Sequence, residues 1–403
     1  MAKQNEYKEK VHTVLCARFG DKTPKAFVHT YGCQGNVADS EHIKGMLVEM
    51  GYELCNAPEE ADIIIYNTCA IREHAEDRVF GNVGALKRLK SENPNLIIAL
   101  CGCMVQQPHI TEKLKESYPF VSLIFGTHVL HRLPELLSKV LCSGKRVFCI
   151  DDSDGVIAEG MPNSRDSGEN AWLPIMYGCN NFCTYCIVPY VRGRERSRDP
   201  ETVLFEAKQL INQGYKKLTL LGQNVNSYGK DSETGVDFSE LLKRIDAIEG
   251  DFTFDFMTSH PRDCSERLID TLASSKHFCG HLHLPVQSGN NRILKEMNRH
   301  YTRERYLELV HYAKEKMPDI DLTTDIIVGF PGETYEEFLD TVSLVKEVEY
   351  GSMFTFIFSP RNGTRAASMP DPVPKAEKSR WFSELLKVQE EIAARHKAEE
   401  NIK

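Results

Sequence analysis

Short apolar runs alternate with longer amphipathic stretches along the first third of this chain. The runs are rich in β-branched and aromatic residues, and each is followed by a stretch whose apolar residues recur with helical spacing. The four predicted strands are 25–31, 61–68, 95–100 and 121–126. Repeated strand–helix units predict a parallel sheet with helices on its faces. We place the start of the first helix at Asp39, Ser40 and Glu41, which offer a cap and early negative charge.

A second alternation of the same kind begins at Trp172 and continues to Ser359. Its predicted strands lie near 173–177, 217–221, 252–257, 281–286, 322–328 and 353–358. Six β/α units are too few to close an eight-stranded barrel, so they predict a partial (β/α)6 barrel. The fold class is therefore α/β, with two different parallel sheets.

Composition changes mark the boundaries between these regions. Residues 151–171 are polar and rich in turn formers, which is typical of a linker, and residues 375–403 read as one charged helix. The expected organisation is an N-terminal extension, an α/β domain, a linker, a barrel and a C-terminal helix, with bounds 1–24, 25–150, 151–171, 172–374 and 375–403.

The composition limits the class of protein. The 403 residues are 41% hydrophobic and 27% charged, which suits folded domains, and the net charge of −9 argues against non-specific coating of nucleic acid. The N-terminus lacks an apolar signal segment, and no run of 18 apolar residues occurs, so we expect a cytoplasmic protein without a membrane span. In that reducing compartment, the 13 cysteines predict metal binding or burial rather than disulfides.

Cysteines follow three of the strands predicted in the first domain. Cys33 comes two residues after its strand, Cys69 directly follows the next, and Cys101 and Cys103 follow the third. Because the carboxyl ends of parallel strands share one edge of a sheet, thiols far apart in sequence converge there. Burial as small hydrophobic residues is the alternative, but it gives no reason for cysteine to recur at strand ends. Six other cysteines show no such pattern and are taken as structural: Cys16, Cys55, Cys142, Cys149, Cys264 and Cys279.

A second cysteine triplet, Cys179, Cys183 and Cys186, follows the first strand of the barrel. A zinc ribbon would use paired CxxC units and four ligands, and no second pair lies nearby. Soft thiolates favour an iron–sulfur cluster, and three of them leave one iron of a cubane open to a small molecule. Downstream lies a basic run in which every second residue is arginine: Arg192, Arg194, Arg196 and Arg198. A solvated face is the ordinary interpretation of such a run, and contact with a nucleic-acid backbone is the functional one.

The second triplet, in GCNNFCTYC, resembles the CxxxCxxC motif of the radical S-adenosylmethionine superfamily, and GFPGET (329–334) resembles its late-barrel turn. From Lys25 onward the chain resembles the methylthiotransferases of that superfamily and, among them, the MiaB-type tRNA enzymes. GCQGN at the first cysteine is nearer to the MiaB-type pattern than to the GCKVNQ or GCPKN of related methylthiotransferases. The stretches that carry the resemblance are 30–41, 67–87, 101–106, 125–137, 259–261, 284–304 and 358–364.

The resemblance implies two 4Fe-4S clusters, each with one open iron. Cys179, Cys183 and Cys186 would hold the cluster that binds S-adenosylmethionine, and Cys33, Cys69 and Cys103 would hold an auxiliary cluster, with Cys101 unassigned. Residues expected to contact S-adenosylmethionine lie beside a cluster ligand or at the strand ends of the barrel. They are Tyr185, Gly222, Gln223, Gln287, Asp325, Gly329, Gly332 and Glu333.

The implied activity is conversion of N6-isopentenyladenosine at tRNA position 37 to its 2-methylthio derivative. Carbon 2 of adenine is an unactivated C–H position, so a cofactor-derived radical is required. Two S-adenosylmethionine molecules would be used per turnover, one for the radical and one to methylate sulfur on the auxiliary cluster. The implied partners are a tRNA anticodon stem-loop, in which the arginine run contacts the backbone, together with an electron donor and a sulfur donor. We expect a monomer.

Alternatives to this activity remain open at the level of sequence. The same chemistry could act on threonylcarbamoyl-adenosine in tRNA or on a ribosomal-protein aspartate, and a non-catalytic metal-binding RNA scaffold would use the cysteines without chemistry. The resemblance also implies a C-terminal TRAM β-barrel that grips tRNA, and the chain stops where that domain would begin.

Overall fold

The computed structural model describes residues 2–70, 73–151, 153, 155–165 and 168–400, which fall into two compact units. Unit 1 spans Met1–Gly168 and Val188–Arg194, and unit 2 spans Glu169–Ile187 and Glu195–Lys403. The short segment Val188–Arg194 thus folds with unit 1, although the chain on both sides of it belongs to unit 2. Parts of the predicted linker (152, 154, 166 and 167) and of the predicted last helix (401–403) lie outside the described residues.

Unit 1 is built on a six-stranded parallel sheet with strand order β2-β1-β3-β4-β5-β6. Its strands are β1 (Lys25–Tyr31), β2 (Glu53–Leu54), β3 (Ile63–Thr68), β4 (Ile97–Gly102), β5 (Leu123–Phe125) and β6 (Val147–Cys149). The four predicted strands are confirmed as β1, β3, β4 and β5. The edge strands β2 and β6 have two and three residues, too few for a periodic pattern in the sequence.

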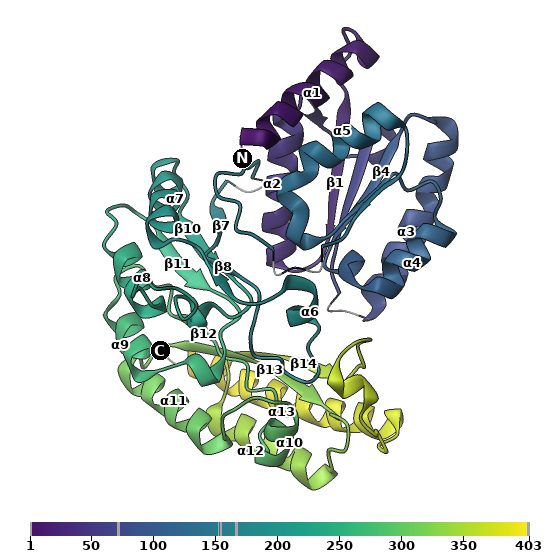
Figure 1. Cartoon of the computed structure of the whole chain (residues 1–403). Coiled ribbons are helices and arrows are strands. Elements are labelled where there is room, and N and C mark those ends of the chain that lie inside the picture. The colour runs from purple at the N-terminus through teal and green to yellow at the C-terminus, as the bar shows by residue number, and fades with distance from the viewer. Residues whose placement is uncertain (1, 71–72, 152, 154, 166–167, 401–403) are drawn as a thin grey trace. The chain divides into compact units, whose positions relative to one another are not determined.

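Helices cover both faces of this sheet (Figure 1). Residues of β3 alternate between the faces, because Ile63 and Ile65 enter one core while Ile64 and Tyr66 enter the other. The first core receives side chains from α1 (Ala2–Phe19), α2 (Gln34–Glu49) and α5 (Leu133–Ser143), and the second from α3 (Glu73–Glu92) and α4 (Pro108–Ser117). Three 3-10 turns connect these elements: η1 (Pro58–Glu60), η2 (Met104–Gln106) and η3 (Thr127–Arg132).

The predicted start of the first helix at residues 39–41 is wrong. Helix α2 begins at Gln34, with Cys33 as its N-cap residue, and the Cys33 carbonyl accepts hydrogen bonds from the next turn. Asp39, Ser40 and Glu41 are buried inside the helix instead of capping it. Asp and Ser are favoured at helix N-caps, and the local sequence does not show when such a residue is instead buried inside a helix by a distant partner.

Unit 2 is a partial barrel in which six parallel strands form two three-stranded sheets, β11-β10-β7 and β12-β13-β14. These strands are β7 (Asn170–Pro174), β10 (Lys217–Leu221), β11 (Thr253–Phe256), β12 (His281–His283), β13 (Asp321–Val328) and β14 (Ser352–Ile357). The predicted six-unit barrel is confirmed. The sequence did not predict the small antiparallel pair of β8 (Met176–Tyr177) and β9 (Arg196–Ser197).

The helices of unit 2 pack on the outer face of these strands (Figure 1). They are α7 (Pro200–Asn212), α8 (Phe238–Asp246), α9 (Glu266–Ser274), α11 (Arg303–Lys316), α12 (Tyr335–Val348) and α13 (Lys375–Glu400). Helix α10 (Asn291–Glu296) instead contributes Ile293 to a small separate cluster with Phe330. The 3-10 turns of this unit are η4 (Val225–Ser227), η5 (Pro261–Asp263) and η6 (Arg365–Ser368). Helix α6 (Val188–Arg192) belongs to unit 1.

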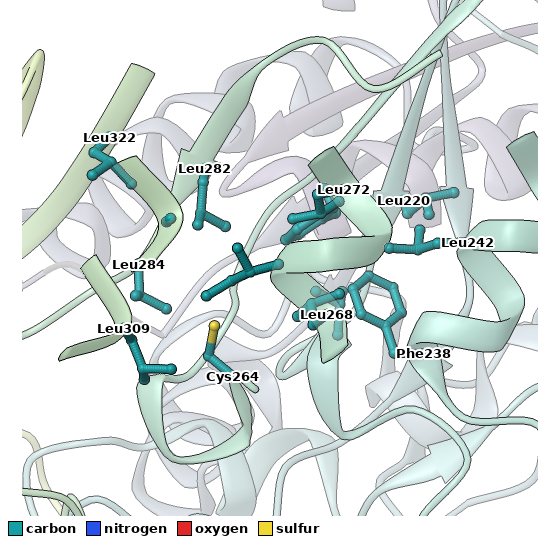
Figure 2. Close-up of a cluster of buried hydrophobic side chains, with 14 of the residues drawn as sticks. Leu220, Phe238, Leu242, Cys264, Leu268, Leu272, Leu282, Leu284, Leu309 and Leu322 are labelled. Carbon is teal, nitrogen blue, oxygen red and sulfur yellow. The ribbon is translucent and has the colours of Figure 1, made fainter. Parts of the chain in front are cut away.

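Leucine dominates the contact between these strands and helices. Figure 2 shows leucines of the strands (Leu220, Leu282, Leu322) and of the helices (Leu242, Leu272, Leu309) in one cluster, with the Cys264 thiol among them. Burial raises the pKa of Cys264 to about 12, so this thiol stays protonated and acts as a small hydrophobic group. The prediction that Cys264 is structural is confirmed.

Helix α13 confirms the predicted charged C-terminal helix over its described length and completes the core of unit 2. Trp381, Leu385 and Ile392 are buried on one face, and the Trp381 ring stacks on Phe338 with centroids 5.5 Å apart. The charged residues of α13 occupy its remaining surface. Among the helices of the described residues, none has the combination of length and hydrophobicity that a bilayer span requires.

We expect Gly102→Ala to destabilise unit 1 strongly. Gly102 is the last residue of β4, has φ +94° and lies directly against Asn67 and Thr68 of the adjacent strand β3. A Cβ at this position would lie 2.3 Å from Asn67 Oδ1 and 2.4 Å from the Thr68 carbonyl oxygen. The expected loss of unfolding free energy is about 3 kcal/mol, measured by denaturant unfolding of the metal-free protein.

Gly144→Ala is the matched control for that variant. Gly144 also has positive φ (+65°) but has no atom within 4 Å of an added Cβ, so only backbone strain of about 1 kcal/mol is expected. Equal losses in the two variants would show that the close approach at Gly102 has no importance for stability.

Candidate functional site

Three cysteines of unit 1 meet at the carboxyl edge of its sheet. The strand register pairs Tyr31 with Thr68 and Thr68 with Gly102, so β1, β3 and β4 end at the same level. The three cysteines that follow these ends are Cys33, Cys69 and Cys103. Cys69 and Cys103 are buried, Cys33 is half-buried, and all three are free thiols. Soft thiols grouped at one edge have the donor chemistry of an iron–sulfur site.

The thiols of this group influence one another electrostatically. A hydrogen bond with Cys69 is the largest cause that lowers the pKa of Cys33 to about 5, and the Arg192 charge and the backbone N–H groups of Gly35 and Asn36 act in the same direction. Burial raises the pKa of Cys103, and the nearby Arg192 guanidinium opposes that effect. A thiol at a helix N-terminus next to a cation is a thiolate at neutral pH, which is the form that binds metal.

A buried polar network lies behind these thiols. The Cys33 sulfur lies 3.5 Å from Asn36 Oδ1, and the Asn36 side chain donates to Asn67 Oδ1 (3.1 Å). Asn67 returns a bond to the Asn36 carbonyl at 2.8 Å and donates to Ser40 Oγ at 3.0 Å. Neither asparagine side chain was singled out from the sequence, although both lie within one to three positions of a predicted ligand. These bonds fix the direction of the loop that carries Cys33.

Cys101, which was left out of the predicted ligands, lies within β4 rather than beyond the end of the strand. It is a strand residue of β4, 1% exposed, and packs in the core between the sheet and its helices. Its carbonyl accepts a hydrogen bond from Thr68 Oγ1 at 2.6 Å, and burial raises the pKa of its thiol. Cys101 therefore has a structural environment.

The predicted tRNA-contacting role is wrong for two of the four arginines. Arg192 is 7% exposed, donates from Nε to Cys103 Sγ at 3.0 Å and pairs with Asp39 at 2.7 Å. Arg198 is equally buried, pairs with Glu206 at 2.9 Å and donates to the Pro174 carbonyl at 2.6 Å. Arginines engaged in buried pairs do not face a polyanion in solvent. Arg194 is exposed and Arg196 half-buried, so these two retain that prediction.

The second triplet lies in unit 2, in a loop that follows β8. Cys179 and Cys183 are buried and Cys186 is half-buried. The loop backbone is bent at Phe182, which has φ +46°, an uncommon value for a residue with a side chain. The backbone N–H of Cys186 bonds to the Cys183 carbonyl at 2.9 Å, which closes a tight turn around the last two cysteines.

Residues from distant parts of unit 2 hold this loop. The Gln223 side chain accepts from the Gly178 N–H, and Glu195 Oε1 accepts from the Asn180 N–H at 3.1 Å. Asn298 Nδ2 donates to the carbonyls of residues 181 and 182 at 3.0 and 3.1 Å. The cysteine positions are thus set by side chains from several loops rather than by the loop alone.

Arg299 is a buried cation next to the second triplet. Its guanidinium donates to Cys183 Sγ at 3.5 Å, to Tyr185 Oη at 3.3 Å and to the Pro285 carbonyl at 2.6 Å. Burial raises the pKa of Cys179 to about 12, so a thiolate there needs a metal or a cation for compensation. Arg299 was not predicted, because it stands among charged residues that resemble a solvated face.

The residues predicted to contact S-adenosylmethionine lie mainly at strand ends of unit 2. Gly222 follows β10, and the Gln287 N–H donates to the Asp325 carbonyl at 2.9 Å, which brings two of the predicted residues together. Gln287 adopts φ +73°, and the Asp325 carboxylate lies 3.6 Å from His283 Nε2. The Gln223 side-chain carbonyl already accepts a hydrogen bond from the Gly178 N–H of the cysteine loop.

The GFPGET turn follows β13 directly. Gly329 and Gly332 have φ +70° and +76°, which a residue with a Cβ rarely adopts. Glu333 is buried and accepts from the N–H groups of Gly329 (2.6 Å) and Phe330 (3.2 Å). Phe330 and Tyr185 pack in the same small apolar cluster. The Glu333 carboxylate therefore shapes the turn from within.

No group of three or more His, Cys, Asp or Glu side chains is arranged around a single ion site in the described part of the chain. A cubane does not require that arrangement, because each thiolate binds a different iron of the cluster. Both triplets, with neighbouring cations and free thiols, fit an iron–sulfur cluster by their chemistry.

Two family models match different parts of the chain. Residues 173–345 match the radical SAM superfamily, and residues 25–126 match a family described as uncharacterized protein family UPF0004. The second cysteine triplet lies in the first match, and the first triplet lies in the second.

Curated relatives align over most of the chain. The tRNA-2-methylthio-N(6)-dimethylallyladenosine synthase of Caldicellulosiruptor saccharolyticus is 56% identical over 364 residues, which cover 90% of this chain and 77% of that protein. The protein with the same name from Clostridium botulinum is 54% identical over 369 residues, which cover 92% of this chain and 82% of that protein.

Solved structures with a similar fold are distant in sequence. The radical S-adenosylmethionine methyltransferase TsrM from Kitasatospora setae, with cobalamin and a [4Fe-4S] cluster bound, matches with a TM-score of 0.61 at 14% identity, over 86% of this chain and 77% of that chain. The cobalamin-dependent S-adenosylmethionine radical enzyme OxsB matches with a TM-score of 0.56 at 14% identity, over 92% of this chain and 56% of that chain. At this identity the likeness concerns the fold alone.

We expect Glu333 to make the stability of the protein pH-dependent. Burial raises the pKa of Glu333 from 4.5 to about 7, although the two N–H groups that it accepts from favour the charged form. Between these values the folded state holds a proton that the unfolded state releases, so stability falls as pH rises through the window, by at most roughly 3 kcal/mol.

Glu333→Gln removes this titration. As pH rises from about 5.5 to about 8, the Tm of the wild type should fall relative to the Tm of that variant. Glu336→Gln, at an exposed position, is the control, and its Tm should change with pH in the same way as the Tm of the wild type. A constant Tm difference between Glu333→Gln and the wild type would contradict the assignment.

Proposed function

Because this chain belongs to the family of tRNA-2-methylthio-N(6)-dimethylallyladenosine synthases, we propose that it adds a methylthio group to carbon 2 of N6-dimethylallyladenosine in tRNA. The observation that carries this proposal is a pair of thiol triplets, one in each unit, in a chain that aligns with these enzymes at 54–56% identity. A radical enzyme with a single cluster would need only the triplet of unit 2. A scaffold without catalysis would need neither the cysteine loop after β8 nor the GFPGET turn, both of which lie in the part of the chain that matches the radical SAM superfamily.

The two triplets hold two 4Fe-4S clusters in this proposal. When bound, the clusters and S-adenosylmethionine supply the radical that activates carbon 2 and the sulfur that is inserted there. Cys179, Cys183 and Cys186 hold the first cluster, and Cys33, Cys69 and Cys103 hold the auxiliary one. Two molecules of S-adenosylmethionine are used per turnover.

The residues around each triplet keep the thiolates in position and compensate their charge. Arg299 donates to Cys183, and Asn298 and Gln223 hold the backbone of the loop. In unit 1, two hydrogen bonds between Asn36 and Asn67 hold the Cys33 loop and involve no cysteine sulfur. Such preformed loops lower the entropy lost when a cluster is bound.

S-adenosylmethionine binds at the strand ends of unit 2 in this proposal. The residues assigned to it are Tyr185, Gly222, Gln223, Gln287, Asp325, Gly329, Gly332 and Glu333. Glu333 and Gln223 act by shaping the turn and the cysteine loop, because their side chains are engaged there. Gly329 and Gly332 have positive φ, which gives the turn a tight backbone without a Cβ at either position.

The macromolecular partner is a tRNA anticodon stem-loop that carries the isopentenylated adenosine. Arg194 and Arg196 contact its phosphates, and the target base leaves its stack to reach the cofactor. An electron donor and a sulfur donor complete the set of partners, and the protein acts as a monomer in the cytoplasm, where its substrate occurs.

Iron content should report two independent clusters. After anaerobic reconstitution we expect about eight irons and eight acid-labile sulfides per chain. The triple variant C179A/C183A/C186A and the triple variant C33A/C69A/C103A should each retain about four, because their sites belong to separate units. Cys142→Ala, at an exposed thiol, is the control and should retain about eight. About four irons in the wild type would contradict the auxiliary site.

Product analysis should separate the two cluster sites. We expect Cys33→Ala to cleave S-adenosylmethionine at a near-normal rate but to lower methylthio product by more than about 100-fold, whereas Cys183→Ala abolishes both reactions. The product is measured by mass spectrometry of nucleosides from tRNA that carries the isopentenylated base.

Parallel assays with tRNA that carries threonylcarbamoyl-adenosine and with a ribosomal-protein substrate should give no product. Turnover of either substrate in place of the isopentenylated tRNA would overturn the proposed specificity, and unimpaired product formation by Cys33→Ala would overturn the auxiliary-cluster assignment.

A further inference from the structure

Segment Val188–Arg194 inserts one buried cation into the thiol group of unit 1. The Thr127 hydroxyl donates to the Val191 carbonyl at 2.7 Å, which attaches helix α6 to turn η3. This anchor directs Arg192 toward the carboxyl edge of the sheet, where its Nε–H donates to Cys103 Sγ at 3.0 Å.

Asp39 holds the other side of the same guanidinium. The Arg192 Nη2 to Asp39 Oδ2 distance is 2.7 Å, and the residues are 7% and 9% exposed. Asp39 lies within α2, the helix whose N-cap is Cys33. The planar guanidinium thus joins a carboxylate on one helix to a thiol at a neighbouring strand end, a geometry that the single ammonium of lysine does not reproduce.

A gain in folding stability does not explain why Arg192 and Asp39 are buried as a charged pair. Burying two charges removes their hydration, and well-packed apolar residues in their place are often equally stable or more stable. The arginine donates to the sulfur of a proposed cluster ligand, and hydrogen bonds to ligand sulfurs together with local net charge set the reduction potential of an iron–sulfur cluster.

We propose that Arg192 is a positioning residue that raises the reduction potential of the auxiliary cluster through its hydrogen bond to Cys103, and that Asp39 orients Arg192 and limits that effect. This inference rests on the proposed function, since it takes the unit 1 thiols as cluster ligands. One-electron reduction makes the cluster more negative, so a cation that donates to its ligand stabilises the reduced form, and an adjacent carboxylate destabilises it.

The test is a dithionite titration of the auxiliary cluster with redox mediators, followed by electron paramagnetic resonance. It uses the full chain with C179A/C183A/C186A, in which the unit 1 site alone binds iron. Arg192→Met should shift the midpoint potential downward, because it removes the cation and the N–H donor. Asp39→Asn should shift it upward, because it removes the opposing charge and keeps a side-chain oxygen that accepts from Arg192. Arg192→Lys should restore part of the shift.

Arg194→Met is the matched control, since it removes the same charge from an exposed side chain two residues away. Its potential should stay near that of the parent. Equal potentials for Arg192→Met, Arg194→Met and the parent, with iron retained, would overturn the inference and leave the proposed function intact. A lower Tm in Arg192→Met at an unchanged potential would also overturn it, because it would show a structural role only.

If Arg192→Met does not retain iron, Asp39→Asn decides: an upward shift supports the inference, and an unchanged or lower potential overturns it. Absence of iron from the C179A/C183A/C186A parent itself would instead contradict the auxiliary site, and so the proposed function.

Discussion

The parallel register of β1, β3 and β4 is the constraint on which the first cysteine site depends. Because their ends are level, three cysteines separated by more than thirty residues in sequence lie at one edge. A slip of one residue in β4 would exchange the faces of its side chains and move Cys101 out of the core. Gly102 protects this register, since its backbone lies against Asn67 and Thr68, where no side chain fits.

Each unit places a buried arginine next to one cysteine of its triplet. Arg192 donates to Cys103 in unit 1, and Arg299 donates to Cys183 in unit 2. Their remaining partners differ, because Arg192 pairs with a carboxylate while Arg299 donates to a carbonyl and two tyrosine hydroxyls. A buried carboxylate also lies near the unit 2 triplet, but Glu195 accepts from the Asn180 backbone N–H rather than pairing with Arg299. Hydrogen bonds to ligand sulfurs and local charge are among the factors that set the potential of an iron–sulfur cluster.

Backbone strain in unit 2 is concentrated near its proposed site. Phe182 lies between two cysteines of the loop, Gln287 follows β12, and both have positive φ. Hydrogen bonds from Asn298 and from the strand β13 backbone stabilise these conformations. Such strain persists only where the surrounding structure fixes it, which is common at functional sites. The loop and turn geometry is therefore a property of the whole unit.

Local periodicity and spacing were enough to predict the alternation of strands and helices, the parallel direction of the strands and the cysteines at strand ends. That the barrel strands divide into two three-stranded sheets did not follow from the sequence. The sequence also did not determine where α2 begins, that Arg192 and Arg198 are buried, that Val188–Arg194 folds with unit 1, or that Arg299 meets a cysteine. An arginine or an aspartate has the same local pattern whether it faces water or a buried partner. Only long-range contacts distinguish the two, since burial of a charge depends on a partner that lies far away in sequence.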